Sequence, residues 1–175
     1  MNRKKRWIDS ILVLVLLLGL FYSSSQPYEN QDIRGNISQL IPDAESVGER
    51  LDGFSFTYGH SEVSVEEDGV AGYIEFFVRK GTHFCTFALL TLLFYRLLRN
   101  WYHPPVALPW SGLLAVLAAV LDEWHQTFTP HRTGIITDIL LDSTGMFTML
   151  LLILGWRTYR KNRTRTRFGR KQLRP

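Results

Sequence analysis

The sequence predicts an all-α membrane protein: a four-helix transmembrane bundle with a small extracytoplasmic loop region between helices 1 and 2. Its apolar residues collect in four long runs, each near the ~20 residues that cross a bilayer as a helix. Basic residues gather at both ends of the chain, whereas acidic residues gather after the first run. Most of the tryptophans lie at expected membrane edges, where an indole ring meets both lipid and water.

The amino-terminal residues predict a membrane anchor that starts in the cytoplasm. Residues 1–6 form a basic cytoplasmic N-terminus, and residues 7–22 form the first transmembrane helix. A cleavable signal peptide is the alternative, because residues 23–25 place small serines after a short apolar stretch. A mature chain that begins near Gln26 would exclude the anchor.

Residues 23–72 predict a polar, acidic segment outside the cytoplasm. A short helix is expected near residues 38–51, and alternating aromatic and small residues around Gly59 predict a β-hairpin. The only cysteine, Cys85, lies in the second apolar run, so this segment folds without an intramolecular disulfide. We expect the segment to cap the outer ends of the helices.

The membrane core, residues 73–156, is expected to hold helices near residues 73–98, 106–121 and 135–156. Residues 157–175 form a basic tail. This tail, the amino-terminal cluster, Arg96 and Arg99 share one side in a four-span topology, so the positive-inside rule places both termini of this multi-pass cell-membrane protein in the cytoplasm. A basic run directly after a span is typical of an anchor attracted to anionic lipid, so we expect no nucleic-acid partner.

Polar residues of the three later helices converge on the outer side of the membrane. The predicted functional cluster comprises Arg79, Lys80, His83, Asp122, Glu123, Gln126, Arg132, Asp138 and Asp142. Asp138, Asp142 and Gly145 recur at i, i+4 and i+7 and share one helix face, where glycine permits close packing of a neighbouring helix. A carboxylate in hydrocarbon is costly unless it is paired, so we expect these acids to face the bundle interior and to meet Arg132 or Lys80.

Two interpretations of this cluster stay open. Intramembrane ionisable residues mark functional sites by default, but an ion pair between Arg132 and Asp138 or Asp142 could serve only to join helix ends. Glu123 and His125, at a wet helix end, could be merely solvated. No tight ligand motif such as His-Glu-x-x-His is present, so neither a metal nor another cofactor is expected.

Several short motifs lie within the cluster. They are Arg-Lys-Gly-Thr-His-Phe at residues 79–84, Asp-Glu-Trp-His-Gln at residues 122–126, Pro130 with Arg132, then Asp138 and Gly145. In these motifs, and over nearly the whole stretch from Tyr22 to Trp156, the chain resembles the VanZ-like family of small bacterial membrane proteins. That family is named for a member associated with resistance to the glycopeptide teicoplanin. The resemblance implies a four-helix protein of the cell envelope. A glycine is expected before the motif arginine, where His131 stands, which leaves the turn geometry open.

The first functional hypothesis is a non-catalytic envelope protein that modulates teicoplanin susceptibility. It would bind membrane lipids, through a lipid headgroup, or a lipid-linked cell-wall precursor. Phosphate or carboxylate would be taken by Arg79, Lys80 and Arg132, and these bases would be oriented by Asp122, Asp138 and Asp142.

Two other classes remain as alternatives. One is an intramembrane enzyme acting on a lipid or cell-wall fragment, with an acid, base or divalent-ion ligands drawn from His83, Asp122, Glu123 and Asp138. The other is a small transporter or transporter subunit, although no inverted repeat is evident. The sequence leaves a homo-oligomer open.

Overall fold

Helices dominate the chain, and four of them are long enough and apolar enough to cross a membrane. The computed structural model describes residues 3–41, 43–51, 53–130, 132 and 134–172. The long helices are α1 (Arg3–Ser24), α4 (Val65–Leu98), α5 (Pro104–Gln126) and α6 (Ile136–Gln172). These elements confirm the predicted all-α membrane bundle, and the last helix continues well into the basic tail.

The segment between α1 and α4 folds into short elements. They are the 3-10 helix η1 (Tyr28–Gln31), helices α2 (Arg34–Leu40) and α3 (Ala44–Leu51), and strands β1 (Phe56–Tyr58) and β2 (Ser61–Val63). The predicted hairpin is confirmed: β1 and β2 are antiparallel, and Gly59 adopts a positive φ of 63° in the turn. The helix expected near residues 38–51 is divided in two, because Ile41 leaves the helical conformation at the end of α2.

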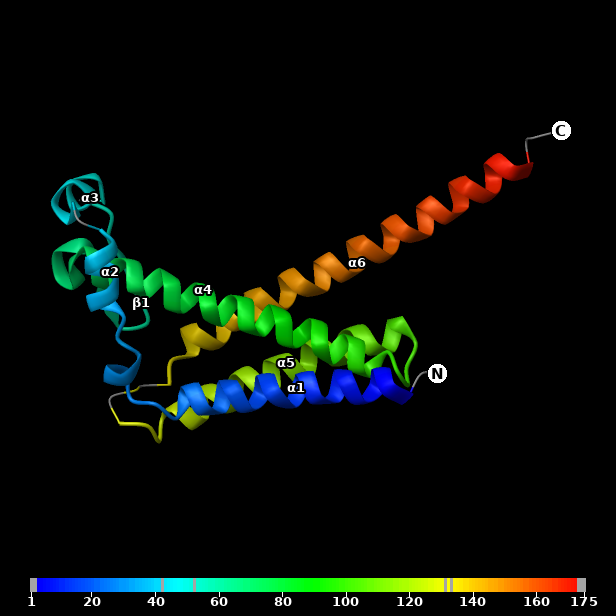
Figure 1. Cartoon of the computed structure of the whole chain (residues 1–175), viewed down its shortest axis with the longest axis horizontal. Coiled ribbons are helices and arrows are strands. Elements are labelled where there is room, and N and C mark those ends of the chain that lie inside the picture. Colours follow the sequence, from blue (N-terminus) through cyan, green and yellow to red (C-terminus); the bar gives the residue numbers. More distant parts are fainter. Residues whose placement is uncertain (1–2, 42, 52, 131, 133, 173–175) are drawn as a thin grey trace.

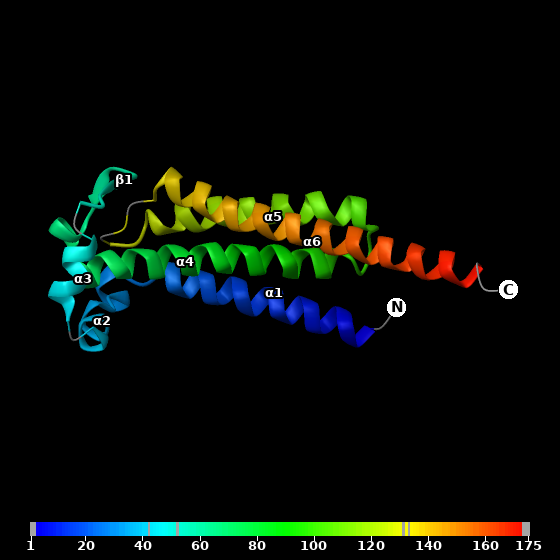
Figure 2. The ribbon, with the colours of Figure 1, turned by 90° about the horizontal axis from the view of Figure 1, so that it is seen from above.

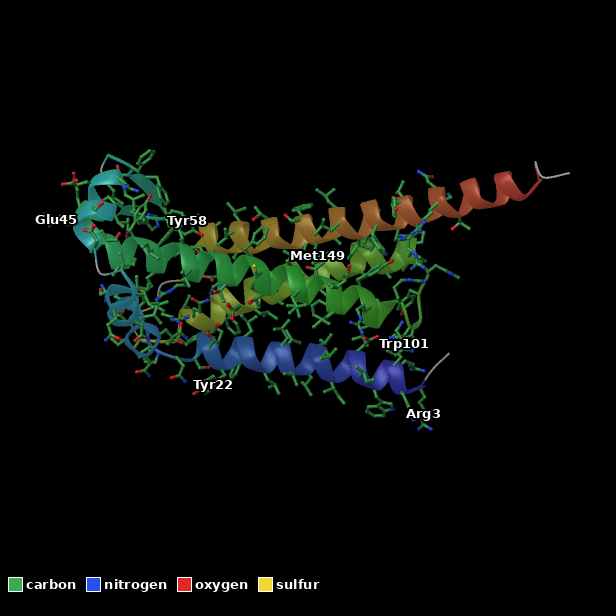
Figure 3. The ribbon with its side chains drawn as sticks, turned by 45° about the horizontal axis from the view of Figure 1, so that its top comes forward. Arg3, Tyr22, Glu45, Tyr58, Trp101 and Met149 are labelled. Atoms are coloured by element: carbon green, nitrogen blue, oxygen red, sulfur yellow. The ribbon has the colours of Figure 1, made fainter. Side chains whose placement is uncertain are left out.

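The long helices run side by side, with α4 in contact with each of the other three. Figures 1 and 2 show the short elements gathered at one end of the bundle, together with the connection from α5 to α6. We call this the head end, and the opposite end, with the amino terminus and the α4–α5 connection, the tail end. Figure 3 shows Tyr58 at the head end and Arg3 and Trp101 at the tail end. Beyond the tail end α6 extends alone (Figure 1).

The bundle core pairs large side chains on α4 with small ones on α5. Phe87 and Leu90 of α4 are fully buried, and they share one core cluster with Ala115 and Ala119 of α5. Small residues let helices approach closely in a bilayer, where packing replaces the hydrophobic force between helices. The outer surface is apolar, as Leu113 with 56 % exposure illustrates, and this suits contact with lipid chains.

α4 begins earlier than the sequence predicted, at Val65 instead of Tyr73. Ser64 caps the helix by accepting a hydrogen bond from the backbone N–H of Glu67 at 3.2 Å. Gly69 then interrupts the helix with φ 67° and ψ 169°, values that glycine adopts without strain. The interruption separates a short first turn from the apolar part of α4, and this first turn belongs to the head end.

Candidate functional site

Lys80 and Asp138 form an ion pair between α4 and α6 at the head end. Nζ of Lys80 lies 2.5 Å from Oδ1 of Asp138. The hydroxyl of Tyr58, on β1, donates to the same carboxylate oxygen at 2.6 Å, and its ring lies 4.5 Å from the ammonium group. Burial and this hydrogen bond raise the pKa of Tyr58 above its ordinary value. The hairpin therefore completes the pair, so the head segment is part of the cluster and not only a cover for it.

Asp142 lies one helical turn deeper on α6 and is fully buried. Its Oδ1 is 3.5 Å from Nδ1 of His83 on α4. Within the described part of the chain, neither oxygen of Asp142 nor Nδ1 of His83 has a hydrogen-bond partner. A buried carboxylate without hydrogen-bond partners costs folding free energy, and this makes Asp142 a candidate for a functional role.

Asp122, Glu123 and Gln126 form one hydrogen-bonded group at the end of α5. The amide nitrogen of Gln126 donates to Asp122 at 2.9 Å and to Glu123 at 3.0 Å. Ser24 of α1 donates to the other oxygen of Asp122 at 2.5 Å, and the backbone N–H of Ile135 donates to Glu123 at 3.0 Å. The Asp-Glu-x-x-Gln motif thus joins α5 to the end of α1 and to the start of α6.

Two glycines allow the backbones near the site to approach closely. A Cβ atom at Gly145 would collide with the backbone carbonyl oxygen of Phe84, so α6 packs directly on α4 next to His83. A Cβ atom at Gly134 would lie 2.5 Å from the carbonyl oxygen of Glu123. The spacing argument identified Gly145, whereas Gly134 lies in a loop where no helical period could identify it.

Arg132, in the α5–α6 loop, has neutral partners. Its guanidinium donates to the side-chain oxygens of Gln126, at 3.4 Å, and of Gln31. Its Nε is buried without a hydrogen-bond partner, and among the described residues no carboxylate lies within ion-pair distance. Burial lowers the pKa of Arg132, and the nearby positive charge of Arg79 lowers it further.

The structure does not show the clamp in which Arg132 holds Asp138 or Asp142. Asp138 instead forms an ion pair with Lys80, and Asp142 lies beside His83. Of the three acids expected to orient bases, only Asp138 contacts one of the expected basic residues. His131, the departure from the family motif, lies outside the described residues.

Arg79 is held by a group of residues that the sequence reasoning missed. Glu75, one turn earlier on α4, is 3 % exposed, and its Oε1 lies 3.5 Å from Arg79. The hydroxyl of Tyr28 donates to Glu75 at 2.9 Å, and the guanidinium of Arg79 lies 4.1 Å above the Tyr28 ring. Burial and the hydrogen bond to Glu75 raise the pKa of Tyr28. The available signal was a carboxylate four residues before Arg79, a spacing that favours an ion pair on a helix.

A second buried acid, Asp9, was also missed, and it lies at the tail end. It accepts hydrogen bonds from Arg96 at 2.7 Å and from Asn100 at 3.3 Å. Asp9 is fully buried between α1 and α4. As the only acidic residue in the first apolar run, it could have been identified from the sequence.

The chemistry available at the head end is the recognition of an anion. Arg79 and Arg132, which we call the arginine pair, both lie at the head end, where the positive charge of Arg79 helps to lower the pKa of Arg132, and Nε of Arg132 has hydrogen-bonding capacity left over. A guanidinium presents a fork of N–H donors that matches phosphate and carboxylate groups. For a metal ion, the described residues provide no group of three or more His, Cys, Asp or Glu side chains in a suitable arrangement.

Comparison with known proteins agrees with the motifs. The model of the VanZ/LLP1 family matches residues 10–157, which include α4, α5, most of α1, the first part of α6 and the whole polar cluster. Neither the curated proteins nor the solved structures give a significant match. The family match covers most of the chain, and the chain therefore belongs to the VanZ/LLP1 family of membrane proteins.

Proposed function

We propose that this VanZ-like membrane protein binds an anionic headgroup, of a lipid or of a lipid-linked cell-wall precursor, through the arginine pair at its head end. The observation that carries the proposal is Arg132, whose guanidinium has amide oxygens for partners and a buried Nε without one. A half-buried cation without a carboxylate partner is stabilised by any anion that reaches it. A phosphate group bound by Arg79 and Arg132 would also offset the repulsion between their positive charges.

The other charged residues support this site by holding its framework. Glu75 positions Arg79, and Asp138 positions Lys80 at the inner edge of the cluster. Both acids are neutralised by these contacts, so they offer little repulsion to a bound anion. Lys80 is 16 % exposed, and its charge is already satisfied, which makes it a weaker anion ligand than Arg132.

The head end belongs outside the cytoplasm in this proposal, and both termini belong inside. The basic residues at 3–6, Arg96, Arg99 and the extension of α6 all lie towards the tail end. A test uses Cys85→Ser chains with a single new cysteine at Glu45 or at Lys161. A maleimide that cannot cross membranes should label the first chain in intact cells and the second only after lysis. The reverse pattern would invert the topology.

Binding is tested with purified protein and two lipids that differ in headgroup charge. Delipidated protein is mixed with phosphatidylglycerol or phosphatidylcholine, and the bound lipid is counted by native mass spectrometry. Arg132→Ala should weaken retention of phosphatidylglycerol about tenfold, the equivalent of about 1.4 kcal/mol, and should leave phosphatidylcholine unchanged. The matched control, Arg163→Ala, removes the same charge from exposed helix beyond the bundle. If Arg132→Ala and Arg163→Ala weaken retention equally, the net charge of the protein explains the effect, and a specific site at Arg132 is contradicted.

A role in teicoplanin susceptibility is part of the same proposal and needs its own test. A sensitive Gram-positive host expresses the wild type, Arg132→Ala or Asp138→Asn at equal membrane abundance. Protection by the wild type alone would link the head-end cluster to glycopeptide tolerance. If all three strains match the empty host, the link to teicoplanin is removed, while the headgroup site is still decided by the binding measurement.

The pair of His83 and Asp142 favours a second candidate, an acid–base reaction on the bound ligand. A partly exposed imidazole whose buried Nδ1 faces an unpartnered carboxylate is an arrangement suited to proton transfer. Purified protein incubated with phosphatidylglycerol would then release a product that mass spectrometry detects, and His83→Asn would abolish the release without lowering lipid retention. If phosphatidylglycerol remains unchanged after prolonged incubation, the acid–base reaction is excluded for this lipid, and the protein only binds it.

A further inference from the structure

α1 is attached to the bundle mainly at its two ends. At the head end Ser24 donates to Asp122, and at the tail end Arg96 donates to Asp9. Between these attachments, Val13 is the only buried residue of α1 in the described structure, and Leu16, Leu17 and Leu20 pack against the core while remaining partly exposed. The middle of α1 is therefore only partly buried against its neighbours.

A groove of about 270 Å³ lies between α1, α4 and α5. Leucines of α1 and α5 form half of its lining, and the polar side chains that line it are Asp122 and His125, both near the head end of α5. Leu117 and Leu121, which line the groove, are each about half exposed on the outer surface. In a bilayer such a groove opens sideways to the lipid chains.

The dimensions of the groove correspond to one leaflet. Its lining residues on α5 run from Leu114 to His125, which at ~1.5 Å per residue is roughly 16 Å. This is about half of the ~30 Å hydrocarbon core of a bilayer. A chain that starts at the polar end of this groove therefore ends near the bilayer midplane, as an acyl chain of one leaflet does.

The groove is connected to the arginine pair through Gln126. The amide oxygen of Gln126 accepts from Arg132, and its amide nitrogen donates to Asp122, which lines the groove. Asp122 does not oppose an anion strongly, because Ser24 and Gln126 already donate to its two oxygens. An apolar groove with polar groups at one end, connected to a guanidinium that has no carboxylate partner, is complementary to an anionic amphiphile.

We infer that the groove holds one acyl chain of a diacyl anionic phospholipid, which enters sideways from the bilayer and presents its headgroup to the arginine pair. The inference rests on the proposed headgroup site and names its ligand class. It also explains the arrangement of α1: polar contacts fix its ends, so the middle can accommodate a chain without loss of the fold.

The test labels the groove with a lipid in nanodiscs. The probe is phosphatidylglycerol with a diazirine near the end of one acyl chain, and the labelled residues are mapped by peptide mass spectrometry after irradiation. In the wild type, label should concentrate on the part of the groove farthest from the head end, at Leu114 and Leu117 of α5. Ala118→Trp fills the groove and should reduce this label about tenfold, which corresponds to about 1.4 kcal/mol. Leu113→Trp, on an exposed part of the same helix, should not.

The outcomes separate this inference from the headgroup site. Label spread evenly over the exposed faces of all four helices would overturn the groove, and Arg132→Ala would still decide the headgroup. Label that stays on the groove in Arg132→Ala, while preference for phosphatidylglycerol over phosphatidylcholine is lost, supports both. A disulfide-linked dimer formed efficiently by Leu117→Cys in Cys85→Ser chains, with no lipid label, would assign the groove to a second copy of the chain. The distribution of label over the wild type tests the groove without any substitution. A variant that fails to fold therefore does not prevent the test.

Discussion

Asp9 and Asp142 are both fully buried aspartates within candidate membrane helices, yet their surroundings differ completely. At the tail end, both oxygens of Asp9 accept hydrogen bonds, from Arg96 and Asn100. At the head end, neither oxygen of Asp142 has a hydrogen-bond partner in the described structure, and His83 is 3.5 Å away. The same residue type at the same burial is therefore satisfied in one place and unsatisfied in the other.

The difference separates a structural ion pair, that of Asp9 with Arg96, from a candidate functional site. We call this ion pair the lock. The ion pair of buried Asp9 with partly exposed Arg96 joins two helices, and its carboxylate oxygens are already occupied, whereas unsatisfied groups retain their capacity to bind or transfer protons. Arg132 follows the same rule, because its Nε is unpartnered at the head end. Burial alone does not single out a candidate functional residue, whereas burial combined with missing hydrogen-bond partners makes Asp142 and Arg132 candidates.

The largest expected effect is at the lock. Arg96→Leu leaves Asp9 buried without its cation and should lower the free energy of unfolding by about 3 kcal/mol, the lower end of the range for buried pairs, because Arg96 itself is 42 % exposed. Equilibrium unfolding in mixed micelles measures this. Arg99→Leu, an exposed arginine three residues further on, is the matched control and should change stability by less than about 0.5 kcal/mol. Equal losses from both substitutions would show that Asp9 and Arg96 are not a lock.

The next effect tests helix packing beside the site. Gly145→Ala puts a methyl group onto the backbone of Phe84 and should lower stability by about 1–3 kcal/mol, because α4 and α6 must separate. Gly155→Ala, on the same helix with open space around it, should be neutral or slightly stabilising. If the two alanines behave alike in the same unfolding assay, close contact at Gly145 is not needed.

A smaller effect of opposite sign is expected at Asp142. Asp142→Asn removes an unsatisfied buried charge and should raise the free energy of unfolding by about 1 kcal/mol in the same unfolding assay. Asp9→Asn should instead lower stability, since it breaks an ion pair. Loss of stability in both asparagine variants would show that Asp142 is paired with a protonated His83, and the contrast between the two ends would then disappear.

The smallest effect concerns pH and the head segment. Hydrogen bonds from Arg34 lower the pKa of Asp32 from 3.8 to about 2. A lowered carboxyl pKa stabilises the fold above its ordinary value, and this contribution is lost as pH falls through about 2. Arg34→Ala should return the pKa of Asp32 towards 3.8 in an NMR titration. Arg50→Ala, which removes another exposed arginine, should leave the pKa of Asp32 near 2. If this substitution also raises the pKa of Asp32 towards 3.8, the net charge of the head segment causes the shift, and the contact with Arg34 does not.

The sequence predicted the helices and the composition of the site better than it predicted the contacts within the site. Span length and the Asp-Glu-x-x-Gln spacing are local properties, so hydropathy and helical period were enough for them. Glu75 was missed because its burial depends on Tyr28, from a different segment. The partner of Arg132 was undecided because the loop that carries it has no period from which to argue.

By itself, the sequence determined that this chain crosses the membrane in four helices, that it is VanZ-like, and that its polar residues gather at one end, because hydropathy, motif spacing and charge placement are written along the chain. The tertiary structure decided which acid pairs with which base, which groups remain without partners, and where α1 leaves a groove. Those outcomes depend on the rotation and depth of each helix relative to the others, and only packing between distant segments sets these.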